Sequence, residues 1–187
     1  AKISVSGKLM IRYLKFNSML RVYPVRADYT ADQLGGLPLI VTHHRERSAF
    51  NLAVYQGDVA AIGARPAGYT YDNERLTPYS FYVYLDSACV DVDYAVAPQA
   101  AAYRLGLRRN DKPSYIMLSS ADGRLAVSGN AVSGWQSLDG RTRVYIHAEF
   151  EQAPVSSYVV KGGKAVPGGN LLNVDQAAAL CNNPFVM

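Results

Sequence analysis

Long apolar runs are missing from this sequence, and no stretch approaches the ~20 consecutive apolar residues of a membrane-spanning helix. Cysteine is scarce too: two residues, Cys89 and Cys181, provide neither a disulfide framework nor a zinc site. They leave one disulfide as an option, although Cys89 lies among apolar residues and is typical of a buried thiol. The sequence therefore predicts no membrane span, and a core that forms without cross-links.

Clustered positive charge is also absent. The net charge is +4, but lysines and arginines are scattered, and their densest cluster, Leu107–Lys112, contains an aspartate. Nucleic acids are recognised by a basic stripe or patch, so we expect no nucleic-acid partner. The chain has no nucleophile elbow, no phosphate-binding loop and no dinucleotide fingerprint. The sequence therefore shows none of these catalytic signatures.

A period of two is the main pattern that the chain does show. Apolar and polar residues alternate along Arg143–Phe150 and along Cys89–Val96, as in half-buried antiparallel strands. Tyr79–Asp86 alternates as well, with bulky residues on both faces, which predicts a strand covered on both sides. Helical signals are few: Thr30–Gly36 could form one capped turn, and Asn173–Leu180 another or the start of a strand.

Short turn motifs separate these runs. Gly129-Asn130, Asp139-Gly140 and Gly162-Gly163 each lie between strand-like arms, which is a hairpin signal. Regular short strands joined by tight turns are typical of sandwiches and barrels. With one compositional regime over 187 residues, we predict a single all-β domain spanning residues 1–187, a two-sheet antiparallel β-sandwich with little helix.

Two polar groups are candidates for binding a substrate. His43, His44 and Arg45 form one group, and Asp72 and Glu74 form the other, in a short polar segment that reads as a turn before the tyrosine-rich strand. Paired carboxylates can act on a glycosidic bond. The alternatives are a polar loop with an ion pair for the first group and a capped turn for the second. The chain also has 14 tyrosines, whose rings suit stacking on sugars.

An ordered series of segments resembles a known family. The segments are "MLRVYPVRADYTADQLGGLPLIVTHHRERSAFNLAVYQGD", "YDNERLTPYSFYVYLD", "DKPSYIMLSSADGRLAVSGNAVSGWQ" and "RVYIHAEFEQAPVSSYV". From about Met19 to Pro167 they resemble the N-terminal β-sandwich of glycoside hydrolase family 92, the calcium-dependent exo-α-mannosidases, which are mostly bacterial. The resemblance implies a sandwich of the supersandwich, galactose-mutarotase-like type, followed by a helical (α/α)₆ barrel.

The resemblance assigns chemistry to the barrel rather than to this chain. The family is inverting, with a glutamate as general acid, aspartates as base and calcium in the barrel, so it implies no catalytic residue and no cofactor here. It implies that this chain is a truncated N-terminal domain. That domain would dock on the catalytic barrel and wall a mannose pocket with the loops that carry His43, His44, Arg45, Asp72 and Glu74.

Further expectations follow for partners and location. The partners would be the barrel and a mannose-containing glycan, and the location would be periplasmic or extracellular. A docking face without its barrel should give weak self-association, with Ala177–Met187 poorly ordered or paired to another molecule. Alternatives are a free-standing secreted carbohydrate-binding or adhesion module, and a structural subunit that pairs by strand exchange.

Overall fold

The protein is described here by a computed structural model, which covers residues 2–6, 25–26, 32–42, 47–58, 60, 68–98, 100–108, 111–151, 153–161, 164–167, 172–174 and 177–182. These residues form sixteen strands, and within these ranges there is no α-helix. The strands are β1 (Lys2–Ser6), β2 (Val25–Arg26), β3 (Gln33–Thr42), β4 (Arg47–Gln56), β5 (Tyr69–Leu76), β6 (Ser80–Leu85), β7 (Val90–Val96), β8 (Ala100–Leu107), β9 (Ser114–Ser120), β10 (Gly123–Ser128), β11 (Ala131–Ser137), β12 (Arg143–Phe150), β13 (Ser156–Lys161), β14 (Lys164–Pro167), β15 (Leu172–Val174) and β16 (Ala177–Asn182).

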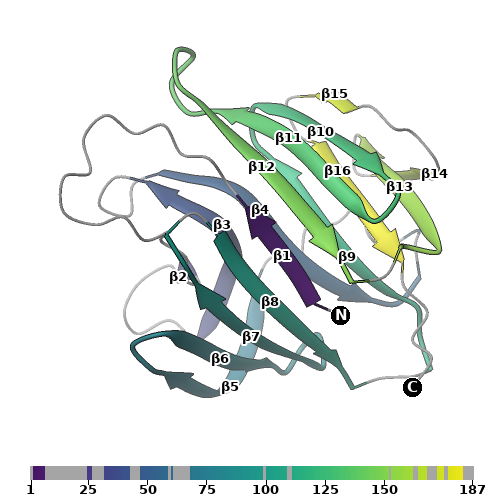
Figure 1. Ribbon diagram of the computed structural model, residues 1–187. Helices are drawn as coiled ribbons and strands as arrows, with labels where there is room; N and C mark the ends of the chain where they lie inside the picture. The colour runs from purple at the N-terminus through teal and green to yellow at the C-terminus, as the bar shows by residue number, and fades with distance from the viewer. Residues whose placement is uncertain are drawn as a thin grey trace.

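The strands pair antiparallel in one continuous path that folds back into two layers. The front sheet has the order β5-β6-β7-β8-β1-β12-β11-β10-β15, and the back sheet has the order β14-β13-β16-β9-β4-β3, with β2 beside β3. Figure 1 shows the two layers, with β1 and β12 crossing in front of β4 and β9. The predicted two-sheet antiparallel β-sandwich is therefore confirmed.

The core fills the space between the sheets with side chains from both. On β12, Val144, Ile146, Ala148 and Phe150 are buried while the residues between them are exposed, as the period of two predicts. The side chains that are at most 1% exposed come from both layers: Leu34, Leu37, Leu39, Leu52 and Val54 of the back sheet, and Val83, Leu85, Val90, Val92, Tyr103, Leu105, Leu125, Val132 and Val144 of the front sheet, among others.

A short strand pairing and a buried tyrosine join the two sheets at one edge. β3 and β5 pair over only two positions, Gln33 with Thr70 and Leu34 with Tyr69. The Tyr69 hydroxyl donates to the Val54 carbonyl over 3.1 Å and accepts from the Val54 N–H over 3.0 Å. Burial raises the pKa of Tyr69 to about 12, so the hydroxyl keeps its proton. Tyr69 thus satisfies backbone hydrogen-bonding groups of β4 at the edge where the back sheet ends and the front sheet begins.

One glutamine spans the sandwich. Gln136 on the inner face of β11 is 4% exposed, and its Oε1 accepts from the Phe50 N–H of β4 over 2.9 Å. The same oxygen accepts from the Ala121 N–H over 3.3 Å. Phe50 has a φ of 56°, a left-handed conformation that costs roughly 1–3 kcal/mol outside glycine. The hydrogen bond from Gln136 holds this backbone in place from the opposite layer.

The turn predictions are confirmed where the structure describes them. Gly129-Asn130 connects β10 to β11, and Gly129 has a φ of 57°. In the β11–β12 connection, Asp139 Oδ1 accepts from the N–H groups of Arg141 and Thr142 over 2.9 and 2.6 Å, as an Asx turn does. Strands β13 and β14 pair on either side of Gly162-Gly163, which lies outside the described residues.

The structure corrects the expected helical turn and the expected position of Cys89, and it decides between the two alternatives for Asn173–Leu180. Gln33–Gly36 begins strand β3 instead of a helical turn, and Asn173–Leu180 contributes to strands β15 and β16, so the strand alternative holds there. Ala177–Asn182 is an interior strand between β9 and β13, whereas residues 183–187 lie outside the described residues, and the expected self-association stays a prediction. Cys89 lies in a turn with a φ of 52°, half-buried and as a free thiol, rather than inside a strand.

Candidate functional site

Asp72 and Glu74 belong to a strand, which corrects the predicted turn. Both lie in β5, and the connection to β6 comes later, where the Thr77 hydroxyl accepts from the Ser80 N–H over 2.9 Å. The register shifts between Asp72 and Arg75, which marks a β-bulge, and Asn73 in that bulge has a φ of 56°. A bulge with a left-handed asparagine has the same local composition as a turn, which explains the error.

The bulge separates the environments of the two carboxylates. Asp72 is opposite Tyr84 on the outer face of the front sheet, and its side chain is exposed. Glu74 is exposed in the bulge itself, near the inner-facing Tyr94. The pKa of Tyr94 is raised well above its usual value, mainly by burial and further by the negative charge of Glu74.

His43, His44 and Arg45 lie outside the described residues. Their flanking residues, Thr42 and Arg47, pair at the end of the ten-residue strand β3, while the β3–β5 pairing is at its other end. At about 3.3 Å per residue, roughly 30 Å of strand separates this end from the start of β5. The structure therefore does not bring the described flanks of the two predicted groups together, and their role in one site stays a prediction.

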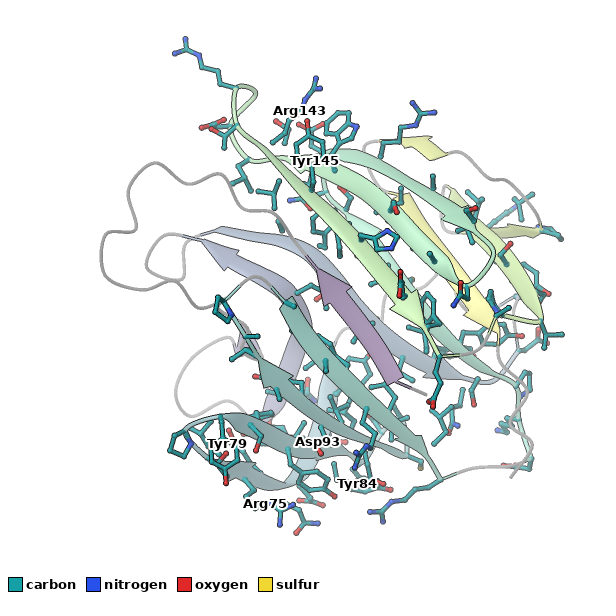
Figure 2. All side chains as sticks on the ribbon, in the orientation of Figure 1. Arg75, Tyr79, Tyr84, Asp93, Arg143 and Tyr145 are labelled. Carbon is teal, nitrogen blue, oxygen red and sulfur yellow. The ribbon has the colours of Figure 1, made fainter. Side chains whose placement is uncertain are left out.

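The predicted tyrosine strand is β6, and arginines cover its outer face. Phe81, Val83 and Leu85 point into the core, while Tyr82 and Tyr84 are half-buried on the outside. The Arg75 guanidinium lies 5.0 Å from the centre of the Tyr82 ring, and that of Arg108 lies 4.3 Å from the Tyr84 ring. Arg75, Tyr79, Tyr84 and Asp93 are labelled in this region in Figure 2.

Asp91 of β7 connects these groups into one network. Arg108 donates from Nε to Asp91 Oδ2 and from Nη2 to Asp91 Oδ1, both over 2.7 Å, and the Tyr82 hydroxyl donates to Oδ1 over 2.6 Å. The carboxylate is thus engaged by three donors, and the tyrosine rings are covered by guanidinium groups. This network stabilises the outer face and presents few free groups to a ligand.

The network makes a pH-dependent contribution to stability. The hydrogen bonds from Arg108, followed by that from Tyr82, lower the pKa of Asp91, although burial opposes them. A lowered folded-state pKa stabilises the fold above the ordinary carboxyl value of about 3.9, and that contribution is lost as the pH falls through the folded pKa. We expect Asp91→Asn to lower the free energy of unfolding by about 0.5–1 kcal/mol at pH 7, since the pair is partly screened by solvent.

Urea unfolding of both proteins at pH 7 and below pH 3 measures this effect. The difference between wild type and Asp91→Asn should shrink at the lower pH, while the exposed Asp122→Asn should match wild type at both. An Asp91→Asn deficit of equal size at both pH values would show that the carboxylate charge does not contribute.

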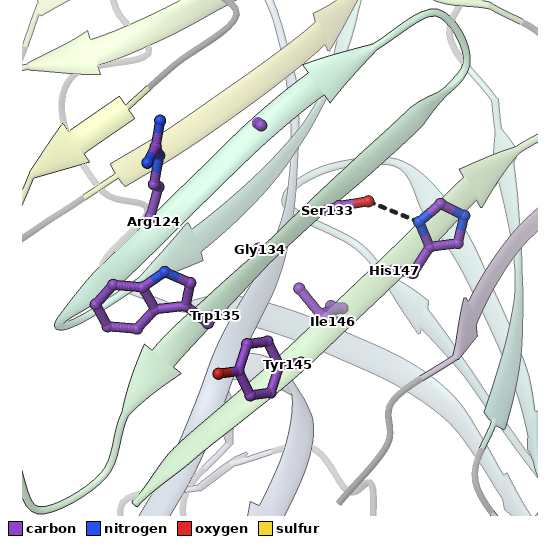
Figure 3. A pocket seen from close by; sticks show the side chains of 8 residues that line it. Arg124, Ser133, Gly134, Trp135, Tyr145, Ile146 and His147 are labelled. Carbon is purple, nitrogen blue, oxygen red and sulfur yellow. Dashed lines mark hydrogen bonds between the residues drawn. The ribbon is translucent and has the colours of Figure 1, made fainter. Parts of the chain in front are cut away.

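The chain's single tryptophan lies on a second part of the outer face of the front sheet. We define the Trp135 surface by six residues on the outer faces of β11 and β12: Ser133, Trp135, Arg143, Tyr145, His147 and Glu149. An open recess of about 360 Å³ runs along it, with Arg124 and Ala126 of β10 on its far side. Figure 3 shows Trp135 and Tyr145 side by side at one end of the recess and Ser133 and His147 at the other.

The side chains of the Trp135 surface are held by one another. The Arg143 guanidinium lies 4.3 Å from the centre of the Trp135 ring. His147 Nδ1 is 2.6 Å from Ser133 Oγ, and His147 Nε2 is 2.9 Å from Glu149 Oε1. The imidazole is therefore oriented from both sides, while nearly half of its surface remains exposed, at 46%.

Sequence reasoning placed His147 on the polar face of its strand but assigned no function to it, and it missed Trp135 and Ser133 altogether. The available signal was weak: a lone tryptophan in a strand next to the alternating polar face of Arg143–Phe150. The pairing of Trp135 with Tyr145 and of Ser133 with His147 depends on the register of β11 against β12.

The described part of the chain carries neither a metal-binding cluster nor a helix suited to span a membrane. No group of three or more His, Cys, Asp or Glu side chains there could hold a metal ion. Nor does any helix in those ranges combine the length and apolar character needed to cross a membrane.

Comparison with solved structures identifies the fold, whereas no protein-family model and no curated protein matches the sequence. The family GH92 inverting mannosidase from Bacteroides thetaiotaomicron VPI-5482 superposes with a TM-score of 0.69 and 13% identity, over 82% of this chain. A family GH92 α-mannosidase from Bacteroides thetaiotaomicron superposes with a TM-score of 0.65 and 16% identity, over 97% of this chain. The same α-mannosidase in complex with mannoimidazole matches equally well.

The match covers nearly all of this chain but a small part of each enzyme. The alignments span 22% of the first mannosidase and 28% of the second. The sandwich fold implied by the sequence resemblance is confirmed, and at these identities the likeness establishes the fold alone. This chain has the β-sandwich fold of one part of the GH92 mannosidases.

Proposed function

We propose that this chain is the non-catalytic β-sandwich domain of an α-mannosidase-type glycoside hydrolase. In this proposal the domain docks on a helical catalytic barrel and forms part of the wall of the mannose pocket. The observation that supports it is the asymmetric coverage: up to 97% of this chain aligns with GH92 enzymes, but at most 28% of an enzyme aligns with this chain. The remainder of such an enzyme would supply the chemistry.

The described residues agree with a non-catalytic role. Asp72 and Glu74, the paired carboxylates of the sequence, lie in different environments, Asp72 opposite Tyr84 and Glu74 in the bulge near Tyr94. We propose that calcium binds to the catalytic partner, as the resemblance to the calcium-dependent family implies. We also propose a periplasmic or extracellular location, where such an enzyme would meet its glycan.

Hydrolysis of 4-nitrophenyl α-mannoside tests the proposal. We expect turnover by the polypeptide of the complete gene, inhibition of that turnover by a calcium chelator, and no turnover by the 187-residue chain alone. Turnover by this chain that is lost in Asp72→Asn or Glu74→Gln would overturn the non-catalytic assignment. A complete gene product without α-mannosidase activity would overturn the assignment of this chain to an α-mannosidase-type enzyme. That result would favour a free-standing binding module.

A further inference from the structure

We propose that the Trp135 surface binds a neutral pyranose residue of a glycan, at a site separate from the pocket wall proposed above. The separation follows from the strand order. Four strands, β6, β7, β8 and β1, lie between β5, which carries Asp72 and Glu74, and β12. At about 4.8 Å per strand, the two surfaces are roughly 24 Å apart across the sheet.

The register of three strands arranges the surface in two rows. Trp135 is opposite Arg124 of β10 and Tyr145 of β12, which makes an aromatic row. Two residues along the strands, Ser133 is opposite His147, which makes a polar row. Adjacent strands are about 4.8 Å apart and same-face rows about 7 Å apart. One pyranose ring can therefore contact both rows at once.

The aromatic row matches the apolar face of a sugar ring. Tyrosine and tryptophan rings present a flat apolar area together with a polar edge, as a pyranose does with its C–H face and hydroxyl rim. Tyr145 is 52% exposed, so its ring is accessible to a ligand. Stacking by Arg143 restrains the Trp135 ring, which lowers the entropy lost when a ligand binds.

The polar row supplies hydrogen bonds in fixed positions. His147 is held between Ser133 and Glu149 over 2.6 and 2.9 Å, so all three polar groups are oriented before a ligand arrives. His147 engages only Oε1 of Glu149, and a carboxylate has two acceptor oxygens. Sugar hydroxyls both donate and accept hydrogen bonds, which suits the carboxylate of Glu149, the hydroxyl of Ser133 and the imidazole of His147.

The recess between the rows fits a single small ligand. Its volume is about 360 Å³ and it is open to solvent, so a ligand there would be covered on one face, as when a sugar ring stacks on an aromatic side chain. Arg124 and Arg143 bring positive charge, but Glu149 opposes it and Arg143 is stacked on Trp135. Charges of both signs therefore share this surface, which is not the clustered basic patch that an anionic ligand favours.

Affinity gel electrophoresis of the 187-residue chain provides the test, with yeast α-mannan as the neutral glycan and polygalacturonate as the anionic one. We expect α-mannan to retard the wild type, Trp135→Ala to weaken this at least 10-fold, and His147→Ala to weaken it several-fold. Tyr79→Ala, which removes a 72% exposed aromatic ring from the distant β5–β6 connection, is the matched control and should behave as wild type. Far-ultraviolet circular dichroism checks that each variant is folded.

The single tryptophan gives a second readout without a label. Adding mannobiose should shift the fluorescence of the wild type and of Tyr79→Ala, with a weaker response in His147→Ala. Absence of α-mannan binding, retardation by polygalacturonate alone, or equal retardation of Trp135→Ala and wild type would each overturn the assignment. Turnover of 4-nitrophenyl α-mannoside by the complete gene product should be unchanged in Trp135→Ala. Its loss would make the Trp135 surface part of the catalytic pocket and overturn the separate site.

Discussion

Gly134→Ala should lower the free energy of unfolding by about 3 kcal/mol, the upper range for an added atom in a closely packed interior. Gly134 is opposite Leu125 in the β10–β11 hairpin. A Cβ at this position would meet the carbonyl oxygen of Arg124 and lie 2.9 Å from the Leu125 Cα. Backbone atoms cannot rotate away as a side chain can, so the two strands must move apart. Urea unfolding measures the loss.

Gly129→Ala is the matched control in the same hairpin. Gly129 has a φ of +57°, and no atom lies within 4 Å of the place that an alanine Cβ would take, so its substitution meets a conformational penalty without a clash. That penalty is about 1–2 kcal/mol for a left-handed residue other than glycine. If Gly134→Ala lowered the free energy of unfolding no more than Gly129→Ala, the inferred close approach of the β10 and β11 backbones would be wrong.

Gln136→Leu should lower the free energy of unfolding by about 1–3 kcal/mol, because it removes the acceptor of the buried Phe50 N–H, together with that of the Ala121 N–H at an exposed residue. The substitution keeps a side chain of similar size, so the main change is the loss of Oε1, which accepts from Phe50 and Ala121 over 2.9 and 3.3 Å. Each unsatisfied buried group costs roughly 1–3 kcal/mol. Phe50 would also lose the contact that holds its φ of 56°.

Two measurements separate this effect from a general loss of packing. Urea unfolding gives the size of the loss, with Ser137→Ala as control, since Ser137 makes an exposed hydrogen bond to the Gly140 N–H over 2.9 Å. Amide hydrogen exchange gives its place: the Phe50 amide should exchange faster in Gln136→Leu than in Ser137→Ala. A Phe50 amide that stays as protected as in wild type would contradict the bridging role of Gln136.

The elements that sequence reasoning predicted well are those set by local chemistry. The alternation in Arg143–Phe150 is reproduced residue by residue in the burial of β12, because a strand exposes alternate side chains to opposite faces. The Gly129-Asn130 and Asp139-Gly140 turns follow from residues that tolerate a positive φ or bond to nearby backbone. Both signals depend on a few neighbouring residues only.

The errors arise where the same local chemistry has two structural outcomes. Asp72–Arg75 has the composition of a turn, yet strand pairing with β6 incorporates it as a bulge that carries Asn73 at a φ of 56°. The interpretation of Asn173–Leu180 stayed open between helix and strand because its run of alanines favours a helix, and the pairing of Ala177–Asn182 between β9 and β13 selects the strand. In both cases partners distant in the sequence override local preference.

The sequence by itself determined the fold class, the Gly129-Asn130 and Asp139-Gly140 turns and the inner face of β12, because these depend on spacing along the chain. Tertiary structure alone decided which polar and aromatic side chains share a surface. Ser133 meets His147, and Trp135 meets Tyr145, only because β11 pairs with β12 in one register. A shift of one residue would send these side chains to the opposite face. Register and strand order are properties of the paired sheet, so the Trp135 surface became visible only in the folded chain.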